Sequence, residues 1–414
     1  MNIANQLDRY SKLLTDVALN LQKDQPVLIE AEITHRDLVT RVVESAYRNG
    51  SPLVEVRYTD PIVQNLRAKL SREENLATQR PGRVADYDHI SDVEGARLLL
   101  CGSEFTDISE DLDPARTSKL DMTRREEMFK YYKEALPNNL VHWTIAPYAT
   151  ESWAKKVYPE LDPIVAKIKL WKDFFTFLRL DQEDYLDFWP KQKSRLDERC
   201  SKLNALEIKT LHFTGPNINF FVGISNKARF ASAGSISRRG HVFFANIPTE
   251  ECFTTPDYRF TEGYLKASRP VELGGKIVKG LFLKFKNGEV VEYKADENEA
   301  AVKSFLEMDP NTRFLGEVAL VGIDSPIFRA NRIYYETLLD ENAACHIALG
   351  AGFSDLIKGS AGLDETALRN LGVNSATQHK DIMISDESVS VVATTYSGRT
   401  IPIITNGKFE DDFL

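Results

Sequence analysis

Residues 26–58, PVLIEAEITHRDLVTRVVESAYRNGSPLVEVRY, decide the fold of the first half of the chain. The apolar run at 26–31 predicts a buried strand, and Thr34 is a suitable N-cap for a helix that an Asn-Gly pair ends at 49–50. A second apolar run at 53–58 predicts the next strand. Strand, helix and strand in this order are typical of a parallel α/β sheet.

The same alternation continues on both sides of this stretch. An amphipathic helix is expected at 4–20, and further apolar strands are expected at 96–102 and 140–146. Residues 150–204 have a helical pattern throughout. No Gly-rich phosphate loop follows the first strand, so the sequence does not predict a nucleotide site. We therefore expect residues 1–205 to form an α/β N-terminal domain with a mostly parallel sheet and a helical linker at its end.

The second half of the chain has short apolar runs separated by Gly-containing turns. An Asn-Gly pair at 287–288 predicts a hairpin, and one helix is expected at about 298–308. We expect residues 206–414 to form an α+β C-terminal domain rich in antiparallel strands. Its expected strands are 208–213, 217–223, 241–247, 277–285, 289–295 and 389–396.

The composition of the 414 residues is that of a soluble globular protein, with 43% hydrophobic and 27% charged residues. The net charge of −9 has no basic stripe beside it, which argues against a nucleic-acid partner. The four cysteines are far apart and form no CxxC pair, as in proteins of a reducing compartment. We find no signal peptide and no apolar run long enough for a membrane span, and therefore expect a cytoplasmic protein without a membrane partner.

Two motifs place carboxylates at or inside apolar strands. NIPTEE, at 246–251, puts two glutamates beside a proline at the end of a strand-like run, although a solvated turn would look the same. In GEVAL, at 316–320, Glu317 lies inside an apolar strand. A buried carboxylate is costly unless it is paired or bound to a metal.

Two further motifs combine imidazole with carboxylate. In DENAACHIALG, at 340–350, Glu341 and His346 are five residues apart, which is not a same-face spacing, so a turn must intervene if both reach one site. A helix start capped by Asp340 is the alternative. In QHKDIMIS, at 378–385, His379 and Asp381 are two apart and share one face of a strand.

Together these motifs offer four carboxylates and two imidazoles, and no thiolate. Two divalent cations would balance the four negative charges. A ligand set of oxygen and imidazole suits Zn²⁺, Co²⁺, Mn²⁺ or Mg²⁺ in a two-metal hydrolase.

At these motifs the chain resembles the thermophilic metallo-aminopeptidase family, the aminopeptidase T, aminopeptidase S and PepS type. The N-terminal half is similar to the family more loosely, through its length, its order of elements and WTIAPYATESWAKKVYP. The matching C-terminal stretches are NIPTEECFTTPD (246–257), FLGEVALV (314–321), YYETLLDENAACHIALG (334–350) and the HxD of QHKDIMI (378–384).

The resemblance implies a metal site in the C-terminal domain. Glu317 would bridge the two metals as the family's glutamate does, and the remaining ligands would flank it. Glu250 is the second choice for the first ligand and the candidate for carrying a proton from water to the leaving amine. The implied metal ligands are Glu251, Glu317, Glu341, His346, His379 and Asp381.

One catalytic position departs from the family. A tyrosine is expected seven residues beyond the histidine of DENAACH, and Phe353 stands there. Phe cannot donate a hydrogen bond to a developing oxyanion, and the loss of such a donor costs roughly 10²–10³ in rate. Two alternatives to a full aminopeptidase follow: a metal-binding homologue with weak or no peptidase activity, and a mononuclear-iron dioxygenase on the same scaffold using His346, His379 and Asp381. The latter would leave three glutamates without a role.

The resemblance also implies partners. Small peptides would be the substrates, losing their N-terminal amino acids to metal-activated water. A homodimer is the assembly that the family implies; the composition itself says nothing about it.

Overall fold

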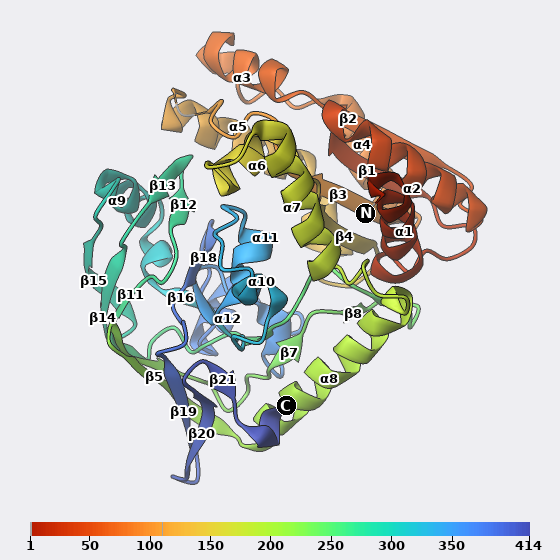
Figure 1. Cartoon of the computed structure of the whole chain (residues 1–414). Coiled ribbons are helices and arrows are strands. Elements are labelled where there is room, and N and C mark those ends of the chain that lie inside the picture. The colour runs from red at the N-terminus through yellow and green to blue at the C-terminus, as the bar shows by residue number, and fades with distance from the viewer. Residues whose placement is uncertain (1, 110) are drawn as a thin grey trace. The chain divides into compact units, whose positions relative to one another are not determined.

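The computed structural model describes residues 2–109 and 111–414, which fall into two compact units (Figure 1). Unit 1 runs to residue 191 and also includes 234–248. Unit 2 comprises 192–233 and 249–414. The division falls within the long helix α8 (Tyr185–Ala205), close to Pro190 inside that helix.

Unit 1 is built on a four-stranded parallel sheet in the order β2-β1-β3-β4, so the parallel sheet expected from the sequence is confirmed. Its strands are β1 (Val27–Glu32), β2 (Val54–Thr59), β3 (Ala96–Cys101) and β4 (His142–Pro147). The helix α1 (Ile3–Lys12) precedes the first strand. The connecting helices are α2 (Arg36–Arg48), α3 (Pro61–Leu70), α4 (Pro81–Asp92) and α5 (Pro114–Glu127), and α6 (Glu151–Val157) and α7 (Pro163–Phe177) follow the last strand. Sequence neighbours in this sheet are joined by helices because parallel strands need a crossover.

A buried ion network ties the sheet of unit 1 to α4. Glu30 on β1 accepts from Arg83 and Arg97 at 2.7 Å each, and Tyr87 donates to the same carboxylate. Burial raises the pKa of Glu30, but the charges of Arg97 and Arg83 outweigh it and bring that pKa down to about 2.

The expectation of a long strand at 241–247 in the second domain is wrong. Only β9 (Val242–Phe243) is a strand there, and it pairs with β8 (Ser235–Ile236). Asn246 instead forms a bridge with Ile145 of β4, so this segment belongs to unit 1. The sequence shows that this run is apolar, but the strand with which it pairs depends on contacts between residues distant in the sequence.

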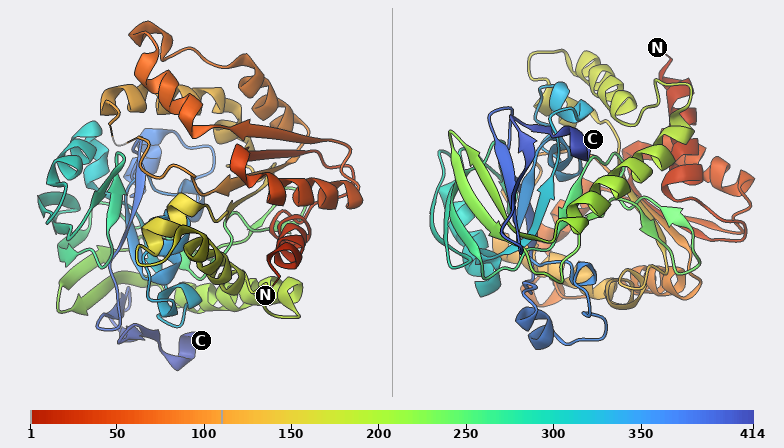
Figure 2. Two further views of the ribbon diagram at one scale, coloured as in Figure 1. Left: turned by 45° about the horizontal axis from the view of Figure 1, so that its top comes forward. Right: turned by 90° about the horizontal axis from the view of Figure 1, so that it is seen from below.

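Unit 2 contains two large antiparallel sheets, whose strands are drawn in colours from green to dark blue in Figure 2. The eight-stranded sheet has the order β15-β14-β11-β6-β5-β19-β20-β21, and the five-stranded sheet has the order β18-β17-β16-β10-β7. The strands of the first are β5 (Ile208–Gly215), β6 (Ile218–Gly223), β11 (Thr261–Lys266), β14 (Phe282–Lys286), β15 (Glu289–Lys294), β19 (Ser390–Thr395), β20 (Thr400–Thr405) and β21 (Lys408–Phe409). Those of the second are β7 (Ala231–Ser232), β10 (Cys252–Thr254), β16 (Leu315–Leu320), β17 (His346–Gly350) and β18 (His379–Met383).

Smaller elements complete unit 2 and agree with the α+β architecture expected from the sequence. The hairpin β12 (Val271–Leu273) and β13 (Lys276–Val278) precedes the helix α9 (Glu299–Met308). Three short helices follow: α10 (Pro326–Arg329), α11 (Thr337–Asp340) and α12 (Glu365–Asn370).

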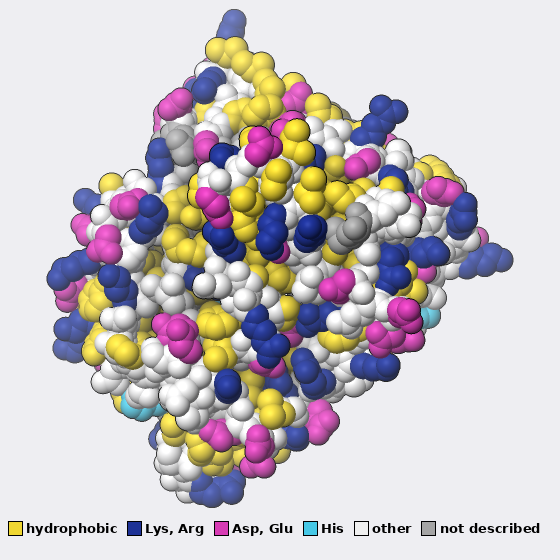
Figure 3. Space-filling view, in the orientation of Figure 1, with side chains coloured by type: hydrophobic (Ala, Val, Ile, Leu, Met, Phe, Trp, Pro, Cys, Tyr) yellow, Lys and Arg dark blue, Asp and Glu magenta, His cyan; other side chains and the backbone are white. Residues whose placement is uncertain are grey.

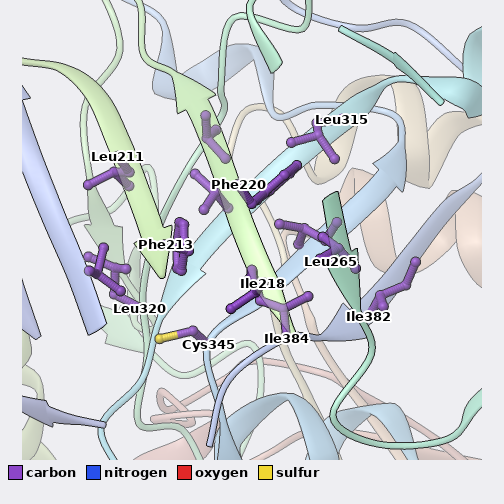
Figure 4. Packing of buried hydrophobic residues seen from close by; sticks show 14 of the residues in the cluster. Leu211, Phe213, Ile218, Phe220, Leu265, Leu315, Leu320, Cys345, Ile382 and Ile384 are labelled. Carbon is purple, nitrogen blue, oxygen red and sulfur yellow. The ribbon is translucent and has the colours of Figure 1, made fainter. Parts of the chain in front are cut away.

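One hydrophobic core lies between the two sheets of unit 2 (Figure 4). Leu211, Phe213 and Phe220 come from the eight-stranded sheet. Leu320 and Ile382 come from the five-stranded sheet and pack into the same cluster. Because side chains alternate along a strand, the other face of the five-stranded sheet is left to display different residues.

The surface carries charges of both signs. On the face shown in Figure 3, Lys and Arg side chains lie among Asp and Glu side chains. Among the described residues, none of the helices combines the length and the apolarity needed to cross a bilayer.

Candidate metal centre

The five-stranded sheet places its polar residues on one face by simple alternation. Across β16, β17 and β18, Glu317 is opposite Ala348, and Ala348 is opposite Asp381. Two residues further along these strands, Ala319 of β16 is opposite His346 of β17. The residues between the charged ones, Ala319 and Ala348, are small and fully buried. The intervening residues Val318, Ile347 and Ile382 point to the core.

A bulge in β16 sets the position of Glu317. The register shifts between Leu315 and Glu317, so Gly316 is the extra residue. A Cβ at Gly316 would lie 2.1 Å from the carbonyl oxygen of Ala351. Only glycine permits this close approach, which identifies a structural reason for the glycine of GEVAL.

Two groups of three side chains could each hold a metal ion. Within each group the candidate ligand atoms lie within 4.8 Å of one another. The first group is Glu251, Glu317 and His346, and the second is Glu317, His379 and Asp381. Glu317 belongs to both.

The two oxygens of Glu317 face different histidines. Its Oε1 is 3.9 Å from Nε2 of His346, and its Oε2 is 3.1 Å from Nε2 of His379. Glu251 Oε2 lies 3.2 Å from Nε2 of His346, and Asp381 Oδ1 lies 3.4 Å from Nε2 of His379. The arrangement is a row with Glu317 in the middle.

Each of the two histidine rings is oriented by a hydrogen bond to a backbone carbonyl. Nδ1 of His346 donates to the carbonyl of Ala344 at 3.1 Å, and Nδ1 of His379 donates to the carbonyl of Ala351 at 2.7 Å. A hydrogen bond at Nδ1 leaves the Nε2 lone pair directed into the cluster, which is how ligating histidines are usually held.

Glu341 reaches the same cluster from a turn. It begins the short 3₁₀ segment Glu341–Ala343, and His346 begins β17, so a turn separates the two as their spacing requires. Glu341 is buried, and the charges of Glu251, Asp381 and Glu317 act on it directly. The two ligand groups thus contain five of the six sequence-predicted ligands, and Glu341 belongs to neither group.

Glu250 points elsewhere. Its Oε2 accepts from Nε2 of Gln192 at 2.8 Å and lies 3.8 Å from the guanidinium of Arg195, both on α8. Its backbone N–H donates to Oδ1 of Asn342 at 2.8 Å. Neither candidate metal group includes Glu250.

Phe353 borders the cluster on the side of His379. The two ring centroids are 5.2 Å apart with an interplanar angle of 54°. Phe353 therefore lies beside a candidate ligand, at the position where the resemblance implies a tyrosine.

Burial and crowding shift the ionisation of the cluster. Burial raises the pKa of Glu317, and burial together with the charge of Glu251 raises the pKa of Glu341. Burial alone would lower the pKa of His346 and of His379, but the surrounding carboxylates raise both above their usual value.

The donor set fits divalent cations. Glu251, Glu317, Glu341 and His346 are all at most 8% exposed, and no Lys or Arg is among the charges that act most strongly on Glu317 or Glu341. Cations held by the cluster would supply the positive charge that these carboxylates otherwise take from protons.

Sequence reasoning missed three supporting residues. Asn342 is fully buried, donates to the carbonyl of Leu338 at 2.9 Å and accepts from Glu250. Gln192 and Gly316 were also not singled out. Only Gly316 left a local signal, a glycine beside a carboxylate within an apolar strand; the partners of Asn342 and Gln192 are distant in sequence.

Comparison with known proteins agrees with this geometry. The sequence model of the thermophilic metalloprotease family (M29) matches residues 3–409. Aminopeptidase T of Thermus thermophilus is 34% identical over 404 residues, which cover 97% of this chain and 98% of that protein. Aminopeptidase AmpS of Bacillus subtilis is 30% identical over 408 residues, covering 99% of each.

A solved structure has the same fold. Wild-type AmpT from Thermus thermophilus superposes with a TM-score of 0.90 at 32% sequence identity, covering 99% of this chain and 100% of that chain.

Proposed function

The chain belongs to the thermophilic metalloprotease family (M29) and is a metal-dependent aminopeptidase, and from that premise we propose that it removes N-terminal amino acids from small peptides with water activated by two divalent ions. The observation that supports two ions is the sharing of Glu317 by both ligand groups. A carboxylate with one oxygen toward each histidine is suited to bridging.

The proposed ligands divide between two positions around this bridge. Glu251 and His346 serve one, and His379 and Asp381 serve the other. Glu341, which is buried but in neither group, is the proposed sixth ligand. When bound, divalent ions polarise a carbonyl and lower the pKa of a water molecule toward neutrality. We propose Zn²⁺, Co²⁺, Mn²⁺ or Mg²⁺, since the donors are oxygen and imidazole.

The residues of the chain have separate parts in this reaction. The four carboxylates Glu251, Glu317, Glu341 and Asp381 would hold the two ions and balance their four positive charges. Glu250 is the proposed proton carrier from water to the leaving amine; because it bonds Gln192 and lies near Arg195 on α8, this role requires its side chain to turn toward the cluster when a peptide binds. The carbonyl contacts of the two histidines keep their rings aligned.

The test is release of the chromophore from amino-acid anilides, together with a dipeptide series, with and without chelator and with each metal restored in turn. We expect activity that chelator abolishes and at least one of the four metals restores. Activity that chelator leaves intact would contradict the proposal.

Metal content separates the proposed reaction from the dioxygenase alternative. Two ions per chain are expected here, whereas a mononuclear iron centre would bind one. One ion per chain after saturation with each metal would remove the bridging role of Glu317.

We further propose a cytoplasmic homodimer acting on small peptides. The support is the similarity to the aminopeptidases of Thermus thermophilus and Bacillus subtilis. Light scattering of the purified protein, giving twice the 46.9 kDa of one chain, is the expected result.

A further inference from the structure

Two phenylalanines form an apolar wall beside the metal cluster. The rings of Phe253 and Phe353 meet edge to face, with centroids 5.5 Å apart at 67°. Phe353 also contacts His379. Both phenylalanines are half-buried, so part of each ring is not covered by the chain. We propose that Phe253 and Phe353 bind the side chain of the substrate's first residue and make the enzyme select apolar first residues; this inference rests on the proposed function.

Phe253 lies on the cluster face because of the register of β10. In this strand Cys252 and Thr254 are fully buried, and Cys252 belongs to the core cluster. Glu251 and Phe253, two apart, therefore share the opposite face. Phe253 is opposite Ala319, which in turn is opposite His346. In this row only the methyl group of the fully buried Ala319 lies between the two residues.

Phe353 is held rigidly in this wall. Its backbone N–H donates to Oγ1 of Thr255 at 2.8 Å, and the same hydroxyl donates to the carbonyl of Phe353 at 3.0 Å. Thr255 is fully buried. These two hydrogen bonds fix the backbone of Phe353, which limits the positions that its ring can take beside the cluster.

The position of the wall makes it a specificity element. A peptide bound for cleavage has its first carbonyl at the cluster, and its first side chain leaves the adjacent carbon atom. An aromatic surface a few ångströms from His379 is within reach of that side chain. Hydrophobic pockets of this kind discriminate by roughly 10–200-fold per methylene group.

The test compares alanine, leucine, phenylalanine, lysine and glutamate anilides on the metal-loaded protein. We expect kcat/KM for leucine and phenylalanine to exceed that for alanine by at least about 10-fold. Phe253→Ala should remove most of this preference while changing the alanine substrate much less. Phe260→Ala, at a phenylalanine that is 61% exposed, is the matched control and should leave the preference intact.

A binding measurement tests the wall independently of turnover. By calorimetry, the wild-type protein should bind free leucine more tightly than free alanine, and Phe253→Ala should make the two similar. If no anilide is hydrolysed but the wild-type protein still binds leucine more tightly than alanine, the proposed function is contradicted and the proposed role of Phe253 and Phe353 is supported. If Phe253→Ala weakens all substrates and both amino acids equally, or if the wild type prefers charged first residues, the wall is overturned.

Discussion

Oε2 of Glu317 lies 3.1 Å from Nε2 of His379, although 62 residues separate the two in the sequence. They meet because β16 and β18 both pair with β17, which puts Glu317, Ala348 and Asp381 in one row across the sheet. The register of three strands therefore determines the spacing of the cluster.

Glu317→Gln should lower both the metal affinity and the peptidase activity. The amide keeps the shape but loses the charge shared by the two ligand groups. Because loss of even an outer partner of a metal ligand lowers affinity about 10–100-fold, we expect at least about 10²-fold weaker metal binding here. Metal analysis after dialysis and anilide turnover measure the two effects. The exposed Glu289→Gln is the control, and retention of both ions by Glu317→Gln would exclude the bridging role.

Glu250→Gln should separate turnover from metal binding. The glutamine can still hydrogen-bond Gln192, and Glu250 is in neither metal group, so both ions should remain. Loss of proton transfer should lower kcat by about 10²–10⁴. The measurement is kcat at matched metal content. Unchanged turnover would assign the proton step to another group, whereas loss of metal would make Glu250 a structural residue.

Phe353→Tyr should raise kcat. The added hydroxyl supplies the donor that the family resemblance implies at this position, and such a donor contributes up to roughly 10²–10³ in rate. Since the ring is kept beside His379, the preference for apolar first residues should change little. Steady-state kinetics on leucine and alanine anilides give both quantities. Equal kcat for the two proteins would show that the site works without this hydroxyl.

Gly316→Ala should damage the cluster through the backbone. Its Cβ would lie 2.1 Å from the carbonyl oxygen of Ala351, so the bulge must shift and carry Glu317 with it. Overpacking of this kind costs about 1–3 kcal/mol in unfolding free energy. Thermal unfolding and metal titration should both worsen. Gly82→Ala, where nothing lies within 4 Å of the added Cβ in helix α4, should lower neither the thermal stability nor the metal affinity.

Acid should weaken unit 1 through Glu30. Its folded pKa of about 2 is below its ordinary value of 4.5, so its contribution is complete above pH 4.5 and is lost as the pH falls toward 2. The difference corresponds to a free energy of unfolding on the order of 3 kcal/mol. In Glu30→Gln this part of the acid dependence should disappear, and stability at pH 7 should fall because the buried Arg83 and Arg97 each lose a charged partner.

Tryptophan fluorescence can follow this unfolding selectively. All four tryptophans, at positions 143, 153, 171 and 189, lie in unit 1. Denaturant titrations at pH 7 and pH 3 should therefore report unit 1 within the full chain. Glu55→Gln, at an exposed position of β2, is the control. Parallel pH curves for wild type and Glu30→Gln would contradict the assignment.

Local pattern was sufficient to predict the parallel sheet and one part of the site. Apolar runs such as 26–31 are buried on both faces in a parallel sheet, and this leaves a clear signal. A period of two likewise put His379 and Asp381 on one face, and the structure directs both toward the same cluster. Their assignment as metal ligands remains a prediction.

Other features depend on contacts that no local pattern encodes. The run at 241–247 pairs within unit 1 because Asn246 meets Ile145, and nothing near 241 announces that partner. The direction of Glu250 toward α8 depends on Gln192, 58 residues away. Two adjacent glutamates thus have different surroundings, and the sequence alone does not say which one faces the cluster.

The alternation along β17 links metal supply to the lifetime of the protein. On this strand the side chain of His346 lies on one face, and that of Ile347 lies in the core on the other face. Ions bound to His346 would therefore also stabilise the packing of Ile347. Ions at 100 times their dissociation constant would stabilise the folded chain by about 2.7 kcal/mol. Under metal starvation the chain should open more often and be cleared by proteolysis, so that its abundance would follow nutrient metal without any change in gene expression.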